Sequence, residues 1–268
     1  MRIQSKIIFH MEPSSAEKIL VPLGLPVKKT DTMQVVNIFV DLSQYIDLIT
    51  TLTSMKVYFS DRQEEIEESE LLTIIPNAYC GYPQPDMDGS FREISYDINS
   101  ACSKCSNGMI QNAPLRMVKP KLGKNDITGI HWVYEYVITL KLKNLIEQAG
   151  LTGHEFWPLI DHKKKTPFEE LYQLFIKNVM PPMSTKANIV RSPGIELCDC
   201  GKTGFMLKGI PAYERESLKS IQDFNKTHEW LGGMKGTWQL PIVSKRVYDL
   251  VKENNIRGVR FEPVQLIG

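Results

Sequence analysis

Apolar residues recur at helical spacing in two segments of the chain that align with each other without a gap. A shift of 105 positions places residues 137–159 (VITLKLKNLIEQAGLTGHEFWPL) on residues 242–264 (IVSKRVYDLVKENNIRGVRFEPV). In both segments the spacing predicts a short strand, an amphipathic helix of about three turns and a further extended segment. Because glycine, phenylalanine and proline also match at this fixed offset, the alignment indicates an internal duplication.

The ends of both predicted helices carry residue types that favour helix termini. Thr139 and Ser244 are the predicted N-cap residues, because a hydroxyl oxygen there can accept a hydrogen bond from a free amide of the first turn. Gly150 in one copy and Asn254 and Asn255 in the other are predicted to end the helix, since these residues tolerate a left-handed backbone conformation.

Elsewhere, segments rich in β-branched and aromatic residues favour strands, and two segments favour helices. The predicted strands are 6–10, 33–40, 55–60, 91–97 and 132–138. The predicted helices are 43–52 and 166–180, the second opening with threonine, proline and two glutamates.

These elements predict an α+β fold in which two related β-helix-β lobes are joined by a cysteine cluster of the zinc-ribbon type. Residues 1–100 are expected to form an additional acidic N-terminal α+β region. Residues 101–268 are expected to hold the duplication, with copies at about 101–160 and 196–268 packed as one compact unit.

Acidic residues are concentrated in the first part of the chain. Residues 1–100 carry 8 Lys and Arg against 15 Asp and Glu, a balance of −7, and the remainder carries 24 against 16, or +8, which gives the net +1. The run SDRQEEIEESE is either a solvated surface or an acidic patch that attracts a basic partner. The candidate partner-binding residues are Glu64, Glu65, Glu67 and Glu68.

Composition restricts the class of protein further. A chain of 268 residues with 42% hydrophobic residues is typical of a globular protein. We find no secretory signal pattern, and no stretch approaches the roughly 18 to 20 apolar residues of a membrane-spanning helix. We therefore expect a cytoplasmic protein with no membrane partner, in which the five cysteines are not a disulfide framework.

Four of the cysteines form two closely spaced pairs, Cys102 and Cys105 in CSKC, and Cys198 and Cys200 in CDC. Two thiolates from one tight turn supply two corners of a tetrahedral zinc site, so these four residues are the predicted ligands of one structural zinc ion. Reduced cysteines without a metal are the alternative. Cys80 is predicted to pack in the core, although it could replace a ligand of the shortened pair.

No arrangement of residues typical of catalysis emerges, so we predict no catalytic residue and no enzyme. The stretch after Cys105 opposes the helix that a thioredoxin-like motif requires. The GKTG sequence lacks the first glycine of a phosphate-binding loop, because that position is Glu196. A closed four-cysteine site leaves no vacant position for a substrate.

The cysteine pairs, the segment GLTGHEFWPL and the terminal SKRVYDLVKENNIRGVRFEPV resemble the double-CxxCG motif proteins. That family includes immunity proteins of bacterial swarming-inhibition and other polymorphic toxin systems. The resemblance covers roughly residues 100–268, and it departs from the family pattern at Ser106, where glycine is expected, and in the shortened second motif.

The resemblance implies a cytoplasmic toxin inhibitor that binds and neutralises a cognate toxin domain by protein–protein interaction. A zinc-ribbon protein that binds nucleic acid is an alternative, although the lysines are dispersed and no aromatic platform accompanies them in sequence. An enzyme with a site assembled from distant loops is a third interpretation.

Overall fold

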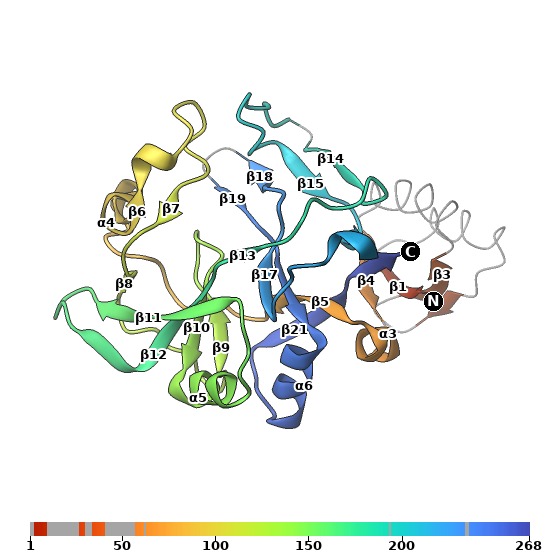
Figure 1. Cartoon of the computed structure of the whole chain (residues 1–268), viewed down its shortest axis with the longest axis horizontal. Helices are drawn as coiled ribbons and strands as arrows, with labels where there is room; N and C mark the ends of the chain where they lie inside the picture. The colour runs from red at the N-terminus through yellow and green to blue at the C-terminus, as the bar shows by residue number, and fades with distance from the viewer. Residues whose placement is uncertain are drawn as a thin grey trace. The chain divides into compact units, whose positions relative to one another are not determined.

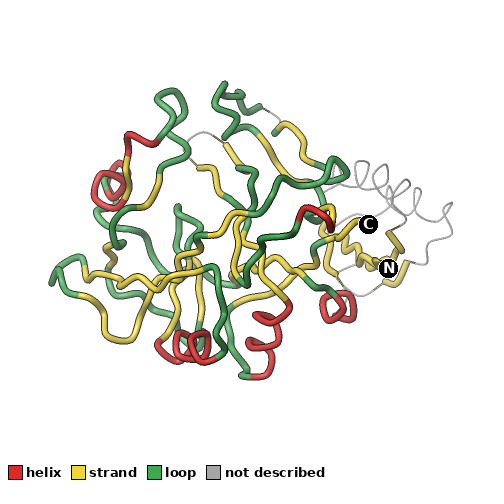
Figure 2. The backbone as a smooth tube through the Cα atoms, in the orientation of Figure 1, coloured by secondary structure: helices red, strands yellow, loops and turns green. Residues whose placement is uncertain are grey.

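The chain is an α+β protein, mostly β-sheet with few helices, in the computed structural model (Figures 1 and 2). The structure describes residues 3–9, 27–29, 34–40, 57–61, 63–192, 194–233 and 236–268, with side chains from residue 66 onward except at position 88. Two compact units are present, residues 1–69 and residues 70–268. The boundary thus precedes the expected position 100, because β5 (Leu71–Pro76) pairs with strands near the C-terminus.

The first unit contains a four-stranded antiparallel sheet in the order β2-β3-β1-β4. Its elements are β1 (Ile3–Phe9), β2 (Val27–Lys29), β3 (Gln34–Val40), β4 (Val57–Asp61) and α3 (Gln63–Glu68). The strands predicted at 6–10, 33–40 and 55–60 are confirmed with small shifts of their ends. The helix predicted at 43–52 lies outside the described residues.

The second unit holds the remaining elements. Its helices are α4 (Phe91–Ser95), α5 (Leu140–Gln148) and α6 (Lys245–Glu253). With β5, the strands before the proline-rich segment are β6 (Tyr96–Asp97), β7 (Ile110–Gln111), β8 (Arg116–Met117), β9 (Ile127–Gly129), β10 (Tyr136–Thr139), β11 (His154–Asp161), β12 (Pro167–Ile176) and β13 (Asn178–Val179). The later strands are β14 (Ile189–Arg191), β15 (Phe205–Leu207), β16 (Ala212–Glu214), β17 (Phe224–Lys226), β18 (Leu231–Gly233), β19 (Gly236–Trp238), β20 (Pro241–Ser244), β21 (Val259–Pro263) and β22 (Gln265–Ile267).

The two five-stranded sheets share a four-stranded arrangement, β11-β12-β10-β9 in one and β21-β5-β20-β17 in the other, and their fifth strands, β8 and β13, lie at opposite ends of it. Their orders are β8-β11-β12-β10-β9 and β13-β17-β20-β5-β21, so the unit β10-α5-β11 corresponds to β20-α6-β21. In each unit an antiparallel strand, β12 or β5, lies between the two strands that flank the helix. The register pairs that correspond are Thr139↔Leu171 with Ser244↔Leu71, and Phe156↔Leu174 with Phe261↔Ile74.

In each sheet, the strand between the two strands that flank the helix comes from the other copy. β5 precedes the first strand–helix–strand unit in the chain but lies in the second sheet, whereas β12 follows that unit and lies in the first sheet. The residue that follows each exchanged strand also bonds to the other copy. The Asn77 amide, after β5, donates to the Gly258 carbonyl at 2.8 Å, and the Lys177 amide, after β12, donates to the Gly153 carbonyl at 3.0 Å. The two corresponding segments therefore begin at β5 and at β12, before the expected starts at residues 101 and 196. Each segment contributes a strand to the sheet of the other.

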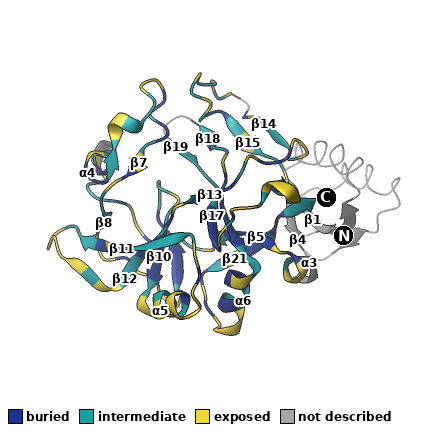
Figure 3. Ribbon diagram, in the orientation of Figure 1, coloured by how far each residue is buried: buried dark blue, intermediate teal, exposed yellow. Residues whose placement is uncertain are grey.

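The core lies between and around these central strands, which are buried in Figure 3. Among the described residues, two clusters of buried apolar side chains belong to it. The first contains Cys80, Leu115, Met117, Leu122, Ile130, Val137 and Leu159, and the second contains Leu71, Met180, Met183, Tyr213, Ile242 and Val264.

Two secondary-structure predictions are wrong. Residues 166–180 carry a helix-like pattern but form β12, because this segment pairs with a strand on each side and buries Gln173 completely. Residues 91–97 were predicted as a strand, but α4 occupies most of them, with the buried Phe91 side chain anchoring its first turn. In both cases tertiary packing overrides local preference.

The N-cap prediction holds for one helix of the pair. The Thr139 hydroxyl accepts from the Leu142 amide at 3.4 Å, as expected. Ser244 occupies the N-cap position of α6, but its hydroxyl donates to the Asp223 carboxylate at 2.7 Å and does not cap the helix. The nearby carboxylate is a stronger acceptor for this hydroxyl than any backbone group.

Candidate metal centre

The two cysteine pairs meet, although 92 residues lie between Cys105 and Cys198 in the chain. Cys102 Sγ lies 3.5 Å from Cys198 Sγ, and Cys105 Sγ lies 3.5 Å from Cys200 Sγ. All four sulfur atoms lie within 4.8 Å of one another. The four predicted ligands are therefore together in one cluster.

The first pair lies in a tight turn that its own backbone closes. The Ser106 amide donates to the Cys102 carbonyl at 2.8 Å, and the Cys102 amide donates to the Asn107 carbonyl at 2.9 Å. Ser106 has a φ of 59°, in the left-handed region that glycine adopts more readily. The turn therefore imposes this conformation at the position where the resemblance expects glycine.

The second pair turns in a related way despite its shorter spacing. The Gly201 amide donates to the Cys198 carbonyl at 3.0 Å, and Gly201 has a φ of 70°. This glycine directly follows the second cysteine, as Ser106 does in the first turn. The positive φ lets the backbone curl, so that two cysteines separated by one residue both contact the other pair.

Side chains outside the sulfur cluster also join the two loops. Lys104 forms an exposed ion pair with Asp199. Lys202 lies against Gly108, where a Cβ atom would stand 2.5 Å from Nζ, and the same ammonium lies 5.8 Å from the centre of the Trp230 ring. The loops are therefore held together by contacts that do not require a metal.

The surroundings favour the thiolate of Cys102 and oppose the thiolates of Cys198 and Cys200. Amides of Cys105 and Lys104 donate to Cys102 Sγ and lower the pKa of that thiol to about 6. Removal from water raises the pKa of Cys200 to about 12, and the neighbouring sulfur atoms act in the same direction. A bound cation reverses this opposition, because it stabilises all the thiolates at once.

The geometry fits a metal with tetrahedral sulfur coordination. At a metal–sulfur distance of about 2.3 Å the ligands of such a site are about 3.8 Å apart, which lies between the 3.5 Å contacts and the 4.8 Å limit of this cluster. Cys105 is buried and the other three are half-buried. The four cysteines could hold a metal ion with only small movements of their side chains.

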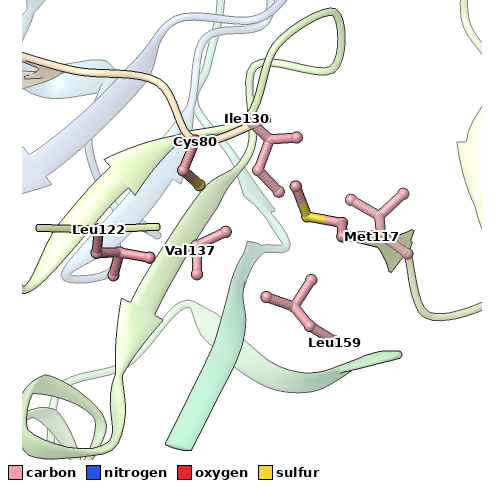
Figure 4. Packing of buried hydrophobic residues seen from close by; sticks show 7 residues of the cluster. Cys80, Met117, Leu122, Ile130, Val137 and Leu159 are labelled. Atoms are coloured by element: carbon pink, nitrogen blue, oxygen red, sulfur yellow. The ribbon is translucent and has the colours of Figure 1, made fainter. Parts of the chain in front are cut away.

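Cys80 is a core residue. It is 4% exposed and belongs to the first apolar cluster, where its side chain lies near those of Ile130 and Val137 (Figure 4). Burial raises the pKa of this thiol, so it stays protonated in its apolar surroundings. The structure therefore assigns it to packing, and the cluster of possible ligands does not include it.

The structure places the predicted acidic contact residues on α3. Glu67 and Glu68 are exposed, and the side chains of Glu64 and Glu65 lie outside the described residues. Glu70, in the second unit, forms a two-pronged ion pair with Arg215, whose guanidinium lowers the pKa of this carboxyl group.

An aromatic groove near the cysteine loops was not predicted from the sequence. Two adjoining cavities of about 540 Å³ and about 440 Å³ share Arg92, Trp132, Tyr134 and Gly236 in their walls. Residues 132–138 were predicted as a strand, but β10 begins only at Tyr136. The alternating aromatic residues at 132–136 predict a strand, but some of them line this groove. The sequence pattern alone therefore does not distinguish a strand from a loop that lines a groove.

No protein-family model matches the chain, and no curated protein matches its sequence. Among the described residues, no helix is long and apolar enough to cross a membrane. The fold and the site define an α+β protein with a four-cysteine cluster that could hold a metal ion.

Proposed function

We propose that the four cysteines bind one structural zinc ion and that the chain is an immunity protein of a bacterial polymorphic toxin system. In this proposal it binds and neutralises a cognate toxin and catalyses no reaction. The observation that carries the proposal is the meeting of Cys102 and Cys105 with Cys198 and Cys200, since these motifs also carry the family resemblance.

Zinc is favoured among metals by the donor set. Four thiolates in a tetrahedron suit Zn²⁺ or an iron–sulfur cluster, whereas magnesium and calcium prefer oxygen ligands. A single ion fits the short sulfur–sulfur distances of 3.5 Å. With all four positions taken by protein ligands, such an ion stabilises the fold and leaves no position for a substrate.

The experiment that tests inhibition uses the product of the adjacent gene. Co-expression should restore growth of bacterial cells that produce this toxin, and the two proteins should co-purify as a complex. Growth arrest that co-expression does not relieve, with no complex on gel filtration, would reject the immunity function. A protein that binds nucleic acid instead would show affinity that falls steeply with salt.

The acidic helix α3 is the candidate contact for a basic toxin. Replacing Glu64, Glu65, Glu67 and Glu68 together by lysine should slow association at low salt by about tenfold or more, because complementary charge steers encounter. Stopped-flow association rates across salt concentrations provide the measurement. The control for a change in net charge compares two double variants, Glu67 and Glu68 replaced by lysine and Glu169 and Glu170 on β12 replaced by lysine, and equal slowing in these two would contradict the assignment.

A further inference from the structure

The groove beside the cysteine loops has an open strand edge as one of its walls. β19 supplies Gly236, Thr237 and Trp238 to its lining, and β7, which lies apart from β19 in Figure 1, supplies Ile110 and Gln111. Among the described strands β19 pairs only with β18. Its second edge can therefore accept another extended chain.

Register identifies the residue whose main chain points to that open edge. The Gly232 carbonyl of β18 points away from β19, because it accepts a hydrogen bond from the Gly204 amide at 2.9 Å. Gly232 lies opposite Thr237, and in an antiparallel ladder such a pair points its N–H and C=O groups away from the partner strand. The main chain of Thr237 is thus directed away from β18.

Aromatic side chains line the groove and are unusually exposed for their size. Trp132 is 50% exposed and Tyr134 is 40% exposed, and Tyr134 stacks on Trp238 with ring centres 4.5 Å apart. Tryptophan, tyrosine and arginine are the residues that dominate binding energy at protein interfaces. Arg92, whose guanidinium lies 5.0 Å from the centre of the Phe91 ring, completes this composition.

The backbone holds these two aromatic residues in a costly conformation. Trp132 has a φ of 74° and Tyr134 a φ of 53°, although bulky residues rarely adopt the left-handed region. The Ile130 amide closes this loop by donating to the Glu135 carbonyl at 2.8 Å. A glycine at either position would relieve the strain but would lose ring contacts, those of Trp132 with Tyr82 and Phe91 or that of Tyr134 with Trp238, so the two effects on stability oppose each other.

The wall also contains polar atoms that lack a hydrogen-bond partner among the described residues. Asn107 is 4% exposed, and its Nδ2 has no acceptor. The Thr237 hydroxyl is likewise buried and unpaired. Such groups are rare in native proteins, and a ligand that supplies a carbonyl oxygen would satisfy the amide of Asn107.

The charges of the groove disfavour nucleic acid as the occupant. Lys226 lies 3.5 Å from the Glu135 carboxylate, and Lys177 lies 2.8 Å from Glu155, so both ammonium groups already have anionic partners. Phosphate binding needs cations that are available to the backbone of the nucleic acid. An open strand edge, aromatic side chains and two paired lysines together fit an uncharged, extended peptide.

We propose that this groove binds an extended segment of a partner protein, which adds to the open edge of β19 and places a large apolar side chain against Trp132, Tyr134 and Trp238. The inference rests on the proposed function only in that the chain acts by binding a partner. It assigns the main contact to the second unit, in addition to the acidic helix of the first.

The test selects a phage-displayed library of random peptides of about 12 residues on the full zinc-loaded chain, a length that exceeds the mean strand. Recovered peptides are synthesised with a fluorescent label, and their affinities are measured by polarisation. We expect them to share a large apolar residue flanked by uncharged residues, and to bind with little dependence on salt.

The decisive variant is Trp132→Gly, which removes the side chain and suits the backbone. We expect the peptide Kd to rise by about tenfold or more while the Tm changes by no more than about 5 °C. Lys165→Gly is the matched control, because Lys165 has a φ of 60° but lies in the hairpin between β11 and β12, outside the groove walls. Tyr134→Gly provides a second variant if the first does not fold.

Failure to recover peptides, or equal peptide affinity in wild type, Trp132→Gly and Tyr134→Gly, would overturn the groove assignment. Recovered peptides rich in basic residues whose binding weakens steeply with salt would also overturn it. If the adjacent gene product does not bind while peptides occupy the groove, the immunity function fails and the groove stands. If that product binds and both glycine variants retain its affinity, the groove fails and the immunity function stands.

Discussion

At the residue scale, most of the described non-glycine residues with positive φ lie in the cysteine loop or line the aromatic groove. Of the five described non-glycine residues with positive φ, Ser106 lies in the cysteine loop, and Trp132 and Tyr134 line the groove. The other two are Lys165 in a hairpin and Asn255, which ends α6 as the sequence predicted. Strain at the first three positions is retained because the surrounding contacts fix the backbone there.

Ser106→Gly should stabilise the protein by about 0.5 to 1 kcal/mol. Glycine removes a strain of about 1 to 2 kcal/mol, and part of this gain is offset because glycine makes the unfolded chain more flexible. Urea denaturation in the presence of a chelator measures the effect without the metal. Ser103→Gly is the control in the same turn, since Ser103 does not have a positive φ, and stabilisation of both variants would contradict the explanation.

His154 should make stability depend on pH. Burial lowers the pKa of this imidazole, which packs between the Phe156 and Phe224 rings with its Nδ1 unpaired. The unfolded chain then binds a proton more readily than the folded chain, so stability is complete above about pH 6.5 and decreases as the pH falls through the folded pKa.

His154→Leu should therefore lose less stability than the wild type between about pH 7.5 and pH 5.5, by up to about 1.4 kcal/mol, because one pH unit of this interval lies below the unfolded pKa of about 6.5. Denaturant titrations at the two pH values measure this difference. His228→Leu, at an exposed position, is the control, and an unaltered pH dependence in the His154 variant would reject the assignment.

At the element scale, each strand–helix–strand unit contacts a strand of the other sheet through a glycine, Gly153 against β17 and Gly258 against β9. A Cβ atom on Gly153 would stand 2.1 Å from the Phe224 carbonyl oxygen, and one on Gly258 would stand 1.9 Å from the Ile127 carbonyl oxygen. The preceding residues complete the contact, since the Phe224 amide donates to the Thr152 carbonyl at 2.9 Å. The duplicated glycine is therefore required by a close approach of two backbones.

Gly153→Ala and Gly258→Ala should each destabilise the protein by more than about 3 kcal/mol. The added methyl group collides with a carbonyl that cannot move without breaking its strand pairing, and the positive φ adds strain. Gly150→Ala is the matched control, because its φ is also positive but nothing lies within 4 Å of the added Cβ atom, so about 1 to 2 kcal/mol is expected. Equal losses at all three positions in thermal or chemical unfolding would contradict the steric argument.

At the scale of the whole second unit, exchanged strands and the cysteine cluster impose long-range order. β5 pairs with strands about 170 residues later in the chain, where Leu71 lies opposite Ser244. The four cysteines join two loops that are distant in sequence. A metal at this cluster would stabilise the folded state by closing a long loop, an effect that grows with loop length.

Removal of the zinc ion that we propose should lower the thermal stability of the whole second unit. The zinc-loaded chain is expected to contain one zinc per molecule, and a chelator should lower its Tm, since binding to the folded state alone stabilises it. Cys105→Ser should reduce the zinc content and the Tm together. Cys80→Ala is the control and should keep its zinc content. Zinc loss from Cys80→Ala, with zinc retained by Cys105→Ser, would refute the ligand assignment.

Part of the fold and of the site could be predicted because the signals are local. Helical spacing, the Thr139 cap and the helix ends at Gly150 and at Asn254 and Asn255 depend on interactions within a few residues, and these predictions are confirmed. The cysteine spacing identified the four residues that cluster. Residues 166–180 and 91–97 were predicted wrongly, because their final structure depends on strands and core residues that are distant in sequence.

The sequence by itself determined the two strand–helix–strand units and which cysteines could share a metal, because turn chemistry and side-chain periodicity act over short stretches of chain. Only the tertiary structure decided that β5 and β12 change places between the sheets, that Cys80 packs in the core, and that Trp132 and Tyr134 line a groove. These features arise from pairing and packing between residues far apart in the chain, where many partners satisfy the same local pattern and the best combined burial and hydrogen bonding selects one.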